Sequence, residues 1–212
     1  WDKYPVEQVA TPEGYARNPE LVINFYNERR KQLLDVVPNA GHLGVADLER
    51  DFNVTVVTQN VDNLHERAGS TRVIHLHGEL TKVCSSRDPY NPHFIKELKP
   101  EEYEVKLGDK AGDGSQLRPF IVWFGEAVPE IETAVKYVEK ADIFVIIGTS
   151  MNVYPAAGLL HYVPRAAEVY LIDPKPVDTH VMRPIHVIRK GASEGVKELK
   201  ASLADTPRSS SL

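Results

Sequence analysis

The chain has 212 residues, of which 42% are hydrophobic and 26% charged, so it is long enough for one large globular domain with its own core. Its net charge of −5 argues against a broad binding surface for nucleic acid or anionic membranes. The single cysteine, Cys84, excludes an internal disulfide and a four-cysteine zinc site, and because no signal peptide or membrane span is recognisable we expect a cytoplasmic protein.

Two helices are expected before the first strand. In the stretch NPELVINFYNERRKQLLDVVP, Asn18 can cap a helix and Pro19 occupies its first turn, where a missing N–H costs nothing. Apolar residues recur there at helical spacing, and Pro38 lies just past the end. The stretch NAGHLGVADLERDF predicts a second, shorter helix that is capped by Asn39.

Strands and a short helix follow. The β-branched run VTVVT, residues 54–58, is typical of a strand buried on both faces. NLHERAG predicts a short helix ended by Gly69, and VIHLH, residues 73–77, predicts a second strand. From Cys84 to Leu117 the sequence is polar and has no clear period, which indicates an inserted excursion.

The alternation of helices and strands returns after this excursion. Buried strands alternating with helices predict βα units, and in the resulting parallel sheets ligands bind where strands end. The sequence therefore predicts an α/β fold with a parallel sheet, helices on both of its faces and a small inserted subdomain. The expected elements are a helix over 128–141, a strand over 142–150, a helix over 154–167, strands over 168–173 and 185–190, and a closing helix over 192–203 capped by Ser193 or its neighbour.

The two most polar strand ends, TQNVDN and IGTS, form the best candidate site. Neutral amides such as Asn60 and Asn63 can bind an amide or ribose hydroxyls through paired donors and acceptors. Turn formation explains them equally well, since Asn and Asp favour turns. Gly148, Thr149 and Ser150 offer backbone N–H groups and hydroxyls suited to phosphate, although no G-x-G-x-x-G fingerprint follows a strand in this sequence.

Two histidines, His75 and His77, lie two residues apart at a strand end, so their side chains are expected to point the same way. This spacing fits three arrangements. The pair could bind a metal, it could supply one general base beside a structural neighbour, or both rings could be hydrogen-bonded in the core.

Taken together, TQNVDNLHERAG, HLHGEL, RPFIVWFGE and IGTS followed by VYPAAG closely resemble, in this order, the sirtuins, which are NAD-dependent protein deacylases. The resemblance extends from about Tyr4 to Leu203. It implies a Rossmann-like NAD-binding domain over 1–83 and 118–205 and a small subdomain over 84–117, while the polar composition of 206–212 indicates a disordered tail. It also implies that NAD and acylated lysine in proteins or peptides react to give nicotinamide, O-acyl-ADP-ribose and free lysine.

The family's roles carry over to the residues that match its motifs. His77, the second histidine of HLHGE, resembles the catalytic base, whereas His75 is expected to be structural. Asn60 and Asp62 resemble the residues that hold the nicotinamide carboxamide, and Gln59 resembles the residue that contacts its ribose. The resemblance further implies adenosine-side contacts from Gly148, Thr149, Ser150, Leu171, Ile172, Asp173 and Ala192, a peptide-pairing strand formed by Val122, Trp123, Phe124, Gly125 and Glu126, and an acyl-lysine tunnel lined by Val153.

Tyr26 and Arg29 are three residues apart on the first long helix and therefore share a face. They resemble the Tyr-x-x-Arg pair of the sirtuin class that removes succinyl and malonyl groups. A guanidinium can bind the terminal carboxylate of such a group through two hydrogen bonds while the phenol donates a third. Spacing alone would instead favour a solvated arginine beside a core tyrosine.

The sequence departs from the family in two places. Most sirtuins bind a structural zinc through four cysteines, but only Cys84 is present here, so we expect no zinc and some other packing that closes the excursion from Ser85 to Leu117. The family's first strand and Gly-Ala-Gly loop would lie before Trp1, so we expect a partial sequence of an active enzyme.

Two other functions remain open at this level. One is a non-catalytic module that binds a nucleotide or an acyl-lysine peptide. The other is a zinc hydrolase built on His75 and His77, for which the sequence contains no further ligand motif.

Overall fold

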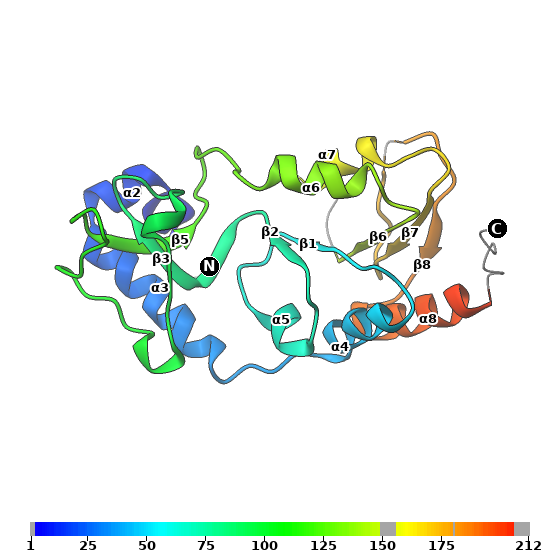
Figure 1. Cartoon of the computed structure of the whole chain (residues 1–212), viewed down its shortest axis with the longest axis horizontal. Helices are drawn as coiled ribbons and strands as arrows, with labels where there is room; N and C mark the ends of the chain where they lie inside the picture. The colour runs from blue at the N-terminus through cyan, green and yellow to red at the C-terminus, as the bar shows by residue number, and fades with distance from the viewer. Residues whose placement is uncertain (1–2, 149–155, 180, 206–212) are drawn as a thin grey trace. The chain divides into compact units, whose positions relative to one another are not determined.

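The computed structural model describes residues 3–148, 156–179 and 181–205. The chain forms two compact units, each assembled from three separate stretches (Figure 1). The first unit comprises Trp1–Val37, Val57–Asn63 and His75–Glu130, and the second comprises Pro38–Val56, Leu64–Ile74 and Ile131–Leu212. Within the described ranges, no helix is long and apolar enough to cross a membrane.

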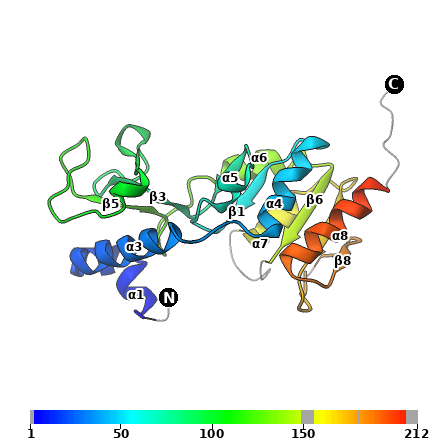
Figure 2. The ribbon, with the colours of Figure 1, turned by 90° about the horizontal axis from the view of Figure 1, so that it is seen from below.

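The first unit packs N-terminal helices against an antiparallel sheet. Its elements are α1 (Val6–Val9), α2 (Pro12–Arg17), α3 (Pro19–Leu33), β3 (Gly78–Ser85), β4 (Lys96–Glu97) and β5 (Leu117–Ile121), with 3₁₀ turns η2 (Pro92–Phe94) and η3 (Pro100–Glu102). The strand order is β4-β3-β5, with both outer strands antiparallel to β3. Figures 1 and 2 show α3 beside this sheet, where Ile23 is buried with Val83 and Val105.

Helix α3 begins where its sequence predicts. The side chain of Asn18 accepts a hydrogen bond from the N–H of Leu21 at 3.2 Å, and Pro19 is the first helical residue. A side-chain cap at this position satisfies an N–H that has no partner within the helix. The expected start is therefore confirmed.

Buried polar side chains of α3 join the helix to the rest of the first unit. Asn27 donates from Nδ2 to the carbonyl of Val105 at 2.7 Å and accepts at Oδ1 from the N–H of Val105 at 2.9 Å. Arg30 donates from Nε to the carbonyl of Leu80 and from Nη1 to Asn27 Oδ1 and to the carbonyl of Tyr103. Burial lowers the pKa of Arg30 to about 10. These bonds bring α3 into the unit that holds the excursion.

The two ends of the excursion meet at Asp113. Its carboxylate accepts hydrogen bonds from the hydroxyls of Ser85 and Ser115, and these bonds lower its pKa to about 2. Arg87 also donates from Nη1 to the carbonyl of Asp113 at 3.3 Å. The adjacent Cys84 is fully buried, and burial raises the pKa of its thiol to about 12. Polar contacts and apolar packing thus close this part of the chain.

The second unit contains a parallel sheet with the strand order β6-β7-β8. Its strands are β6 (Ile143–Ile147), β7 (Glu168–Ile172) and β8 (His186–Ile188), and its helices are α4 (Ala40–Asp47), α5 (Leu64–Ala68), α6 (Ile131–Val138), α7 (Ala156–Leu159) and α8 (Ala192–Ala204), with 3₁₀ turns η1 (Leu48–Arg50) and η4 (Leu160–Tyr162). Figure 1 shows α4 and α8 on one side of this sheet and α6 and α7 on the other. The expected α/β class with a parallel sheet is confirmed.

Helix α8 approaches β7 closely because it carries a glycine at the contact. A Cβ added at Gly195 would lie 2.2 Å from Cγ2 of Ile172. Val196 and Leu199 of the same helix are buried with Ile172 and Ile188 in one hydrophobic cluster. This cluster fixes α8 against the sheet.

A two-stranded sheet of β1 (Val56–Thr58) and β2 (Val73–His75) completes the fold, and both strands are shorter than expected. Helix α5 follows β1 in sequence, and Gly69 ends it with a φ of +109°. Asn39 caps α4 as expected. Ser193 does not cap α8, because Gly191 is the N-cap residue and it makes no side-chain hydrogen bond.

The division into units differs from the boundaries expected from the sequence. Residues 84–117 were expected to form the small subdomain alone, with 1–83 and 118–205 in the larger domain. In the structure, 1–37, 57–63 and 75–130 belong to one unit. The reason is tertiary: α3 packs on β3 and β5 and hydrogen-bonds to Leu80, Tyr103 and Val105.

Replacing Asn27 by alanine is expected to destabilise the first unit. The buried N–H and C=O of Val105 would lose their partners, and each unsatisfied group costs about 1–3 kcal/mol, so the free energy of unfolding should fall by about 2–6 kcal/mol. Urea denaturation measures this value. Asn24→Ala on the exposed face of α3 is the matched control and should change it by less than about 0.5 kcal/mol. Equal effects of the two variants would contradict the role given to Asn27.

Candidate active site

Backbone hydrogen bonds hold the amide-rich corner 57–63 against the stretch 75–80 within the first unit. The N–H of Leu76 donates to the carbonyl of Thr58 at 2.9 Å, and the N–H of Leu80 donates to the carbonyl of Val61 at 2.8 Å. The carbonyl of His77 accepts from the N–H of Val122 at 2.8 Å. Three segments distant in sequence therefore meet around His77.

His77 is half-buried beside Gln59. Burial lowers the pKa of its imidazole, and a hydrogen bond with the backbone of Gln59 partly opposes this shift. Burial disfavours the charged form, so the environment of the ring favours neutral imidazole. A neutral imidazole can accept a proton, so the structure brings together the histidine and the glutamine that the sequence predicted for one site.

His75 has a different environment from His77. Its ring is buried, with Nδ1 3.1 Å from the carbonyl oxygen of Asn60 and Nε2 3.9 Å from Glu79 Oε1. Both nitrogens of His75 thus face protein groups of its own unit. This arrangement fits the structural role expected for His75.

The corner between β1 and α5 is a tight turn that presents polar groups. The N–H of Asn60 donates to Thr58 Oγ1 at 3.0 Å, while Asn60 itself is exposed and Asp62 is half-buried. Asn63 Oδ1 is buried and has no hydrogen-bond partner among the described residues. A buried acceptor without a partner is costly, so it suits a ligand that brings an amide or hydroxyl donor. The corner therefore fits the carboxamide and ribose of a nicotinamide nucleotide.

The segment expected to pair with a peptide is a turn in this structure. Strand β5 ends at Ile121, and the N–H of Glu126 donates to the carbonyl of Trp123 at 3.0 Å. The N–H of Phe124 donates to the carbonyl of Ala10 at 3.0 Å, while its side chain is 68% exposed. Gly125 has a φ of +90°, which glycine adopts without strain. The segment therefore presents its turn, and not a regular strand edge, to solvent.

Tyr26 and Arg29 lie on one face of α3, but the phenol is already bonded inside the protein. Tyr26 is 2% exposed, donates to the carbonyl of Val9 at 2.9 Å and accepts from Trp123 Nε1 at 3.1 Å. Burial raises its pKa to about 12. Arg29 is half-buried, and its Cζ lies 4.6 Å from the ring centroid of Phe25. The expected hydrogen bond from Tyr26 to an acyl carboxylate would require the loss of its bond to Val9.

The residues expected on the adenosine side lie in the second unit, at the carboxyl edge of the parallel sheet. Gly148 follows β6 with a φ of +59°, and its N–H donates to the carbonyl of Ile172 at 3.1 Å. Leu171 and Ile172 are buried at the end of β7, Asp173 follows them, and Ala192 begins α8. This edge is where open parallel sheets bind ligands. Thr149, Ser150 and Val153 lie outside the described residues.

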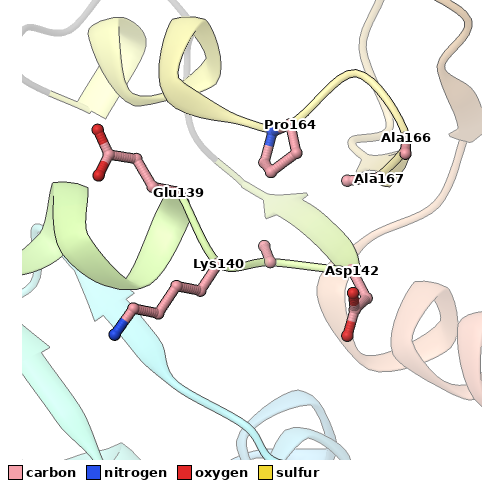
Figure 3. A pocket seen from close by; sticks show the side chains of 7 residues that line it. Glu139, Lys140, Asp142, Pro164, Ala166 and Ala167 are labelled. Carbon is pink, nitrogen blue, oxygen red and sulfur yellow. The ribbon is translucent and has the colours of Figure 1, made fainter.

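A surface cavity of about 290 Å³ lies at the opposite edge of this sheet (Figure 3). It is lined by residues 139–142, which precede β6, and by Pro164, Ala166 and Ala167, which precede β7. Because ligands of such sheets bind at the carboxyl ends of the strands, this cavity is not part of the expected NAD site.

Arg118 was absent from the residues predicted for the site. It is 4% exposed in β5, and its guanidinium binds the carboxylate of Glu126 at 3.0 and 3.1 Å. An arginine in the otherwise apolar run RPFIVWF, followed eight residues later by a glutamate, was the available signal. The pairing itself depends on the turn that brings Glu126 back to β5.

Comparison with known proteins identifies the family. The model of the Sir2 family matches residues 1–155. The NAD-dependent protein deacylase of Bacteroides thetaiotaomicron is 84% identical over 207 residues, which cover 98% of this chain and 88% of that protein. The NAD-dependent protein deacylase of Helicobacter pylori strain 26695 is 44% identical over 205 residues, covering 97% of this chain and 87% of that protein.

A solved structure gives the same result. The crystal structure of a Sir2 homologue bound to NAD superimposes with a TM-score of 0.80 at 35% identity, covering 96% of this chain and 80% of that one. The expected α/β fold is therefore confirmed, and it is the fold of Sir2 homologues. This chain belongs to the Sir2 family, the sirtuins.

Proposed function

We propose that His77 is the general base of an NAD-dependent protein deacylase and that Gln59, Asn60 and Asp62 hold the nicotinamide end of NAD beside it. Family membership and the 84% identical relative make the chain a protein deacylase of the sirtuin type. The observation that carries the residue roles is the half-buried imidazole of His77, hydrogen-bonded to the backbone of Gln59.

The residues of this corner suit a reaction at a ribose carbon that becomes cation-like. NAD supplies that carbon when nicotinamide leaves, and the acyl group of lysine is transferred to the ADP-ribose part. Neutral amides at 59–60 and the carboxylate of Asp62 bind there without the repulsion that a cationic side chain would cause. Asn63, whose buried Oδ1 lacks a partner among the described residues, offers a further acceptor for the amide or a hydroxyl.

His77 removes the proton of a ribose hydroxyl in this proposal. A base is effective when its pKa lies near or below the working pH, because the neutral form is then the populated one. Burial lowers the pKa of His77 and so favours the neutral form that can accept the proton. Nδ1 of His75 lies 3.1 Å from the carbonyl oxygen of Asn60 and helps to fix the backbone of this corner.

Replacing His77 by alanine should lower kcat for deacylation by about 10²- to 10⁴-fold, the usual contribution of one general base. The protein would be assayed with NAD and an acyl-lysine peptide, by mass spectrometry of the peptide and by nicotinamide release. His93→Ala, an exposed histidine of the same unit, is the matched control. Undiminished deacylation by the His77 variant would refute the base. Absence of nicotinamide release by the unmutated protein in a single turnover would favour the non-catalytic binding module.

We propose acidic acyl groups, succinyl and malonyl, as preferred substrates, with acetyl also accepted. Arg29 carries this proposal, since its guanidinium packs on Phe25 beside Tyr26 and can bind a carboxylate through two hydrogen bonds. Tyr26 contributes in a different way from the one the sequence suggested. Its hydroxyl proton is directed to Val9, so its part is to fix Trp123 against α3.

Replacing Arg29 by methionine should lower kcat/KM for a succinyl-lysine peptide by about 10-fold or more, since a hydrogen bond to a charged group contributes about 1.5–3 kcal/mol. Turnover of an acetyl-lysine peptide should stay within about twofold. Steady-state kinetics on the two peptides make the comparison, and Arg17→Met on α2 of the same unit is the control, because that arginine is exposed. An equal loss on both peptides would contradict the acidic-acyl pocket.

The remaining contacts are also proposed. Acylated lysine of a protein or peptide binds along the turn formed by Val122, Trp123, Phe124, Gly125 and Glu126, and Val153 lines its tunnel. The adenosine side of NAD contacts Gly148, Thr149, Ser150, Leu171, Ile172, Asp173 and Ala192.

The small subdomain is proposed to close without zinc, and the hydrogen bonds at Asp113 support this closure. The cytoplasmic location stays a prediction.

A further inference from the structure

A buried ion pair underlies the proposed peptide turn. Arg118 donates from Nη1 to Glu126 Oε2 at 3.0 Å and from Nη2 to Glu126 Oε1 at 3.1 Å, and its side chain is 4% exposed while that of Glu126 is 14% exposed. Nη2 also donates to the carbonyl of Ile121 at 2.8 Å. Glu126 Oε1 in turn accepts from the N–H of Trp123 at 2.8 Å. The pair thus ties both ends of the turn to β5.

The same pair is connected to α3 through the indole of Trp123. The guanidinium of Arg118 lies 3.9 Å from the ring centroid of Trp123, which is 2% exposed. Trp123 Nε1 donates to the hydroxyl of Tyr26 at 3.1 Å, and that hydroxyl donates to the carbonyl of Val9 at 2.9 Å. A continuous series of contacts therefore connects Glu126, through Arg118, Trp123 and Tyr26, to the helical turn that carries Arg29.

Packing alone does not explain why charges occupy this place. Burying two ions costs desolvation that their attraction only roughly repays, so an apolar pair of the same volume could be as stable. A bidentate guanidinium–carboxylate pair does add a fixed geometry, because its two hydrogen bonds are parallel and planar. Here the pair contacts three groups of the turn and so fixes their positions: the N–H of Trp123, the carbonyl of Ile121 and the plane of the indole.

We infer that Arg118 and Glu126 are positioning residues for the acyl-lysine substrate. They hold the turn 123–125 on one side of that substrate and, through Trp123 and Tyr26, the Arg29 face of α3 on the other. Neither side chain is given a contact with NAD, so their loss should affect recognition of the peptide and leave nucleotide binding nearly unchanged. The inference rests on the proposed function.

Glu126→Gln tests it in the intact protein, since glutamine keeps the volume and the acceptor for Trp123 N–H but not the charge. The KM for acyl-lysine peptides should rise about tenfold or more, as small displacements in a site can reduce activity by about 10². The dissociation constant of NAD, measured by calorimetry, and kcat should stay within about twofold. Glu97→Gln, an exposed change of the same kind in β4, should alter none of these values.

Two further variants separate positioning from general stability. Arg118→Lys keeps the positive charge but loses the planar guanidinium that binds both carboxylate oxygens. Its peptide KM should therefore stay above that of the unmutated protein. The double variant Arg118→Met with Glu126→Met replaces the pair by apolar groups, remains measurable if the single change unfolds the protein, and should show the same rise in KM. Trp123→Phe removes the donor to Tyr26 and part of the ring that packs on Arg118, and it should raise KM more for succinyl-lysine than for acetyl-lysine peptides.

The outcomes distinguish this inference from the proposed function. An unmutated protein that releases no nicotinamide would remove both. Two results in an active protein would overturn the positioning role alone. One is an unchanged peptide KM in the Glu126→Gln variant. The other is a loss of NAD affinity and kcat in that variant as large as its rise in KM.

Discussion

The backbone hydrogen bonds between the corner 57–63 and the stretch 75–80 are the contacts on which the site depends. The N–H of Leu76 donates to Thr58 and the N–H of Leu80 donates to Val61. These bonds hold a polar turn and the start of β3 at a fixed separation. His77 lies within this pairing and is half-buried, and burial is the first cause of its lowered pKa. The chemistry proposed for the imidazole is therefore a consequence of main-chain geometry and of burial, with no acidic partner required.

In the first unit, buried side chains join α3 and the excursion to the antiparallel sheet. Asn27 satisfies both backbone groups of Val105, and Arg30 donates to two carbonyls and to Asn27. At the other end of the excursion, Asp113 accepts from two serines. Hydrogen-bonded buried polar groups specify one arrangement of the segments, since each alternative would leave donors or acceptors unpaired. The substrate-side elements α3 and the turn 122–126 belong to this same unit.

Local signals in the sequence were enough to predict several of the elements, whereas the short helices α1 and α2 and the strands β3 and β4 were not predicted. Asn18 and Asn39 cap their helices, and the β-branched run before Thr58 is a strand, because these features depend on neighbours in sequence. Gln59 and His77 follow two paired strands, so their proximity could also be predicted. Tertiary contacts decide the rest: the pairing of Arg118 with Glu126, the internal bonds of Tyr26 and the inclusion of α3 in the first unit. Ser193 shows the converse, a good capping residue that lies one position inside its helix.

The central claim is that His77 is held neutral beside Gln59 by its partial burial. An NMR titration of its imidazole, assigned by the signal lost in a His77→Gln variant, measures this directly in the protein without nucleotide. The account predicts a midpoint below pH 6.5, the ordinary value for histidine. A midpoint at or above that pH would contradict it, because burial would then not be the dominant influence on the pKa of the imidazole.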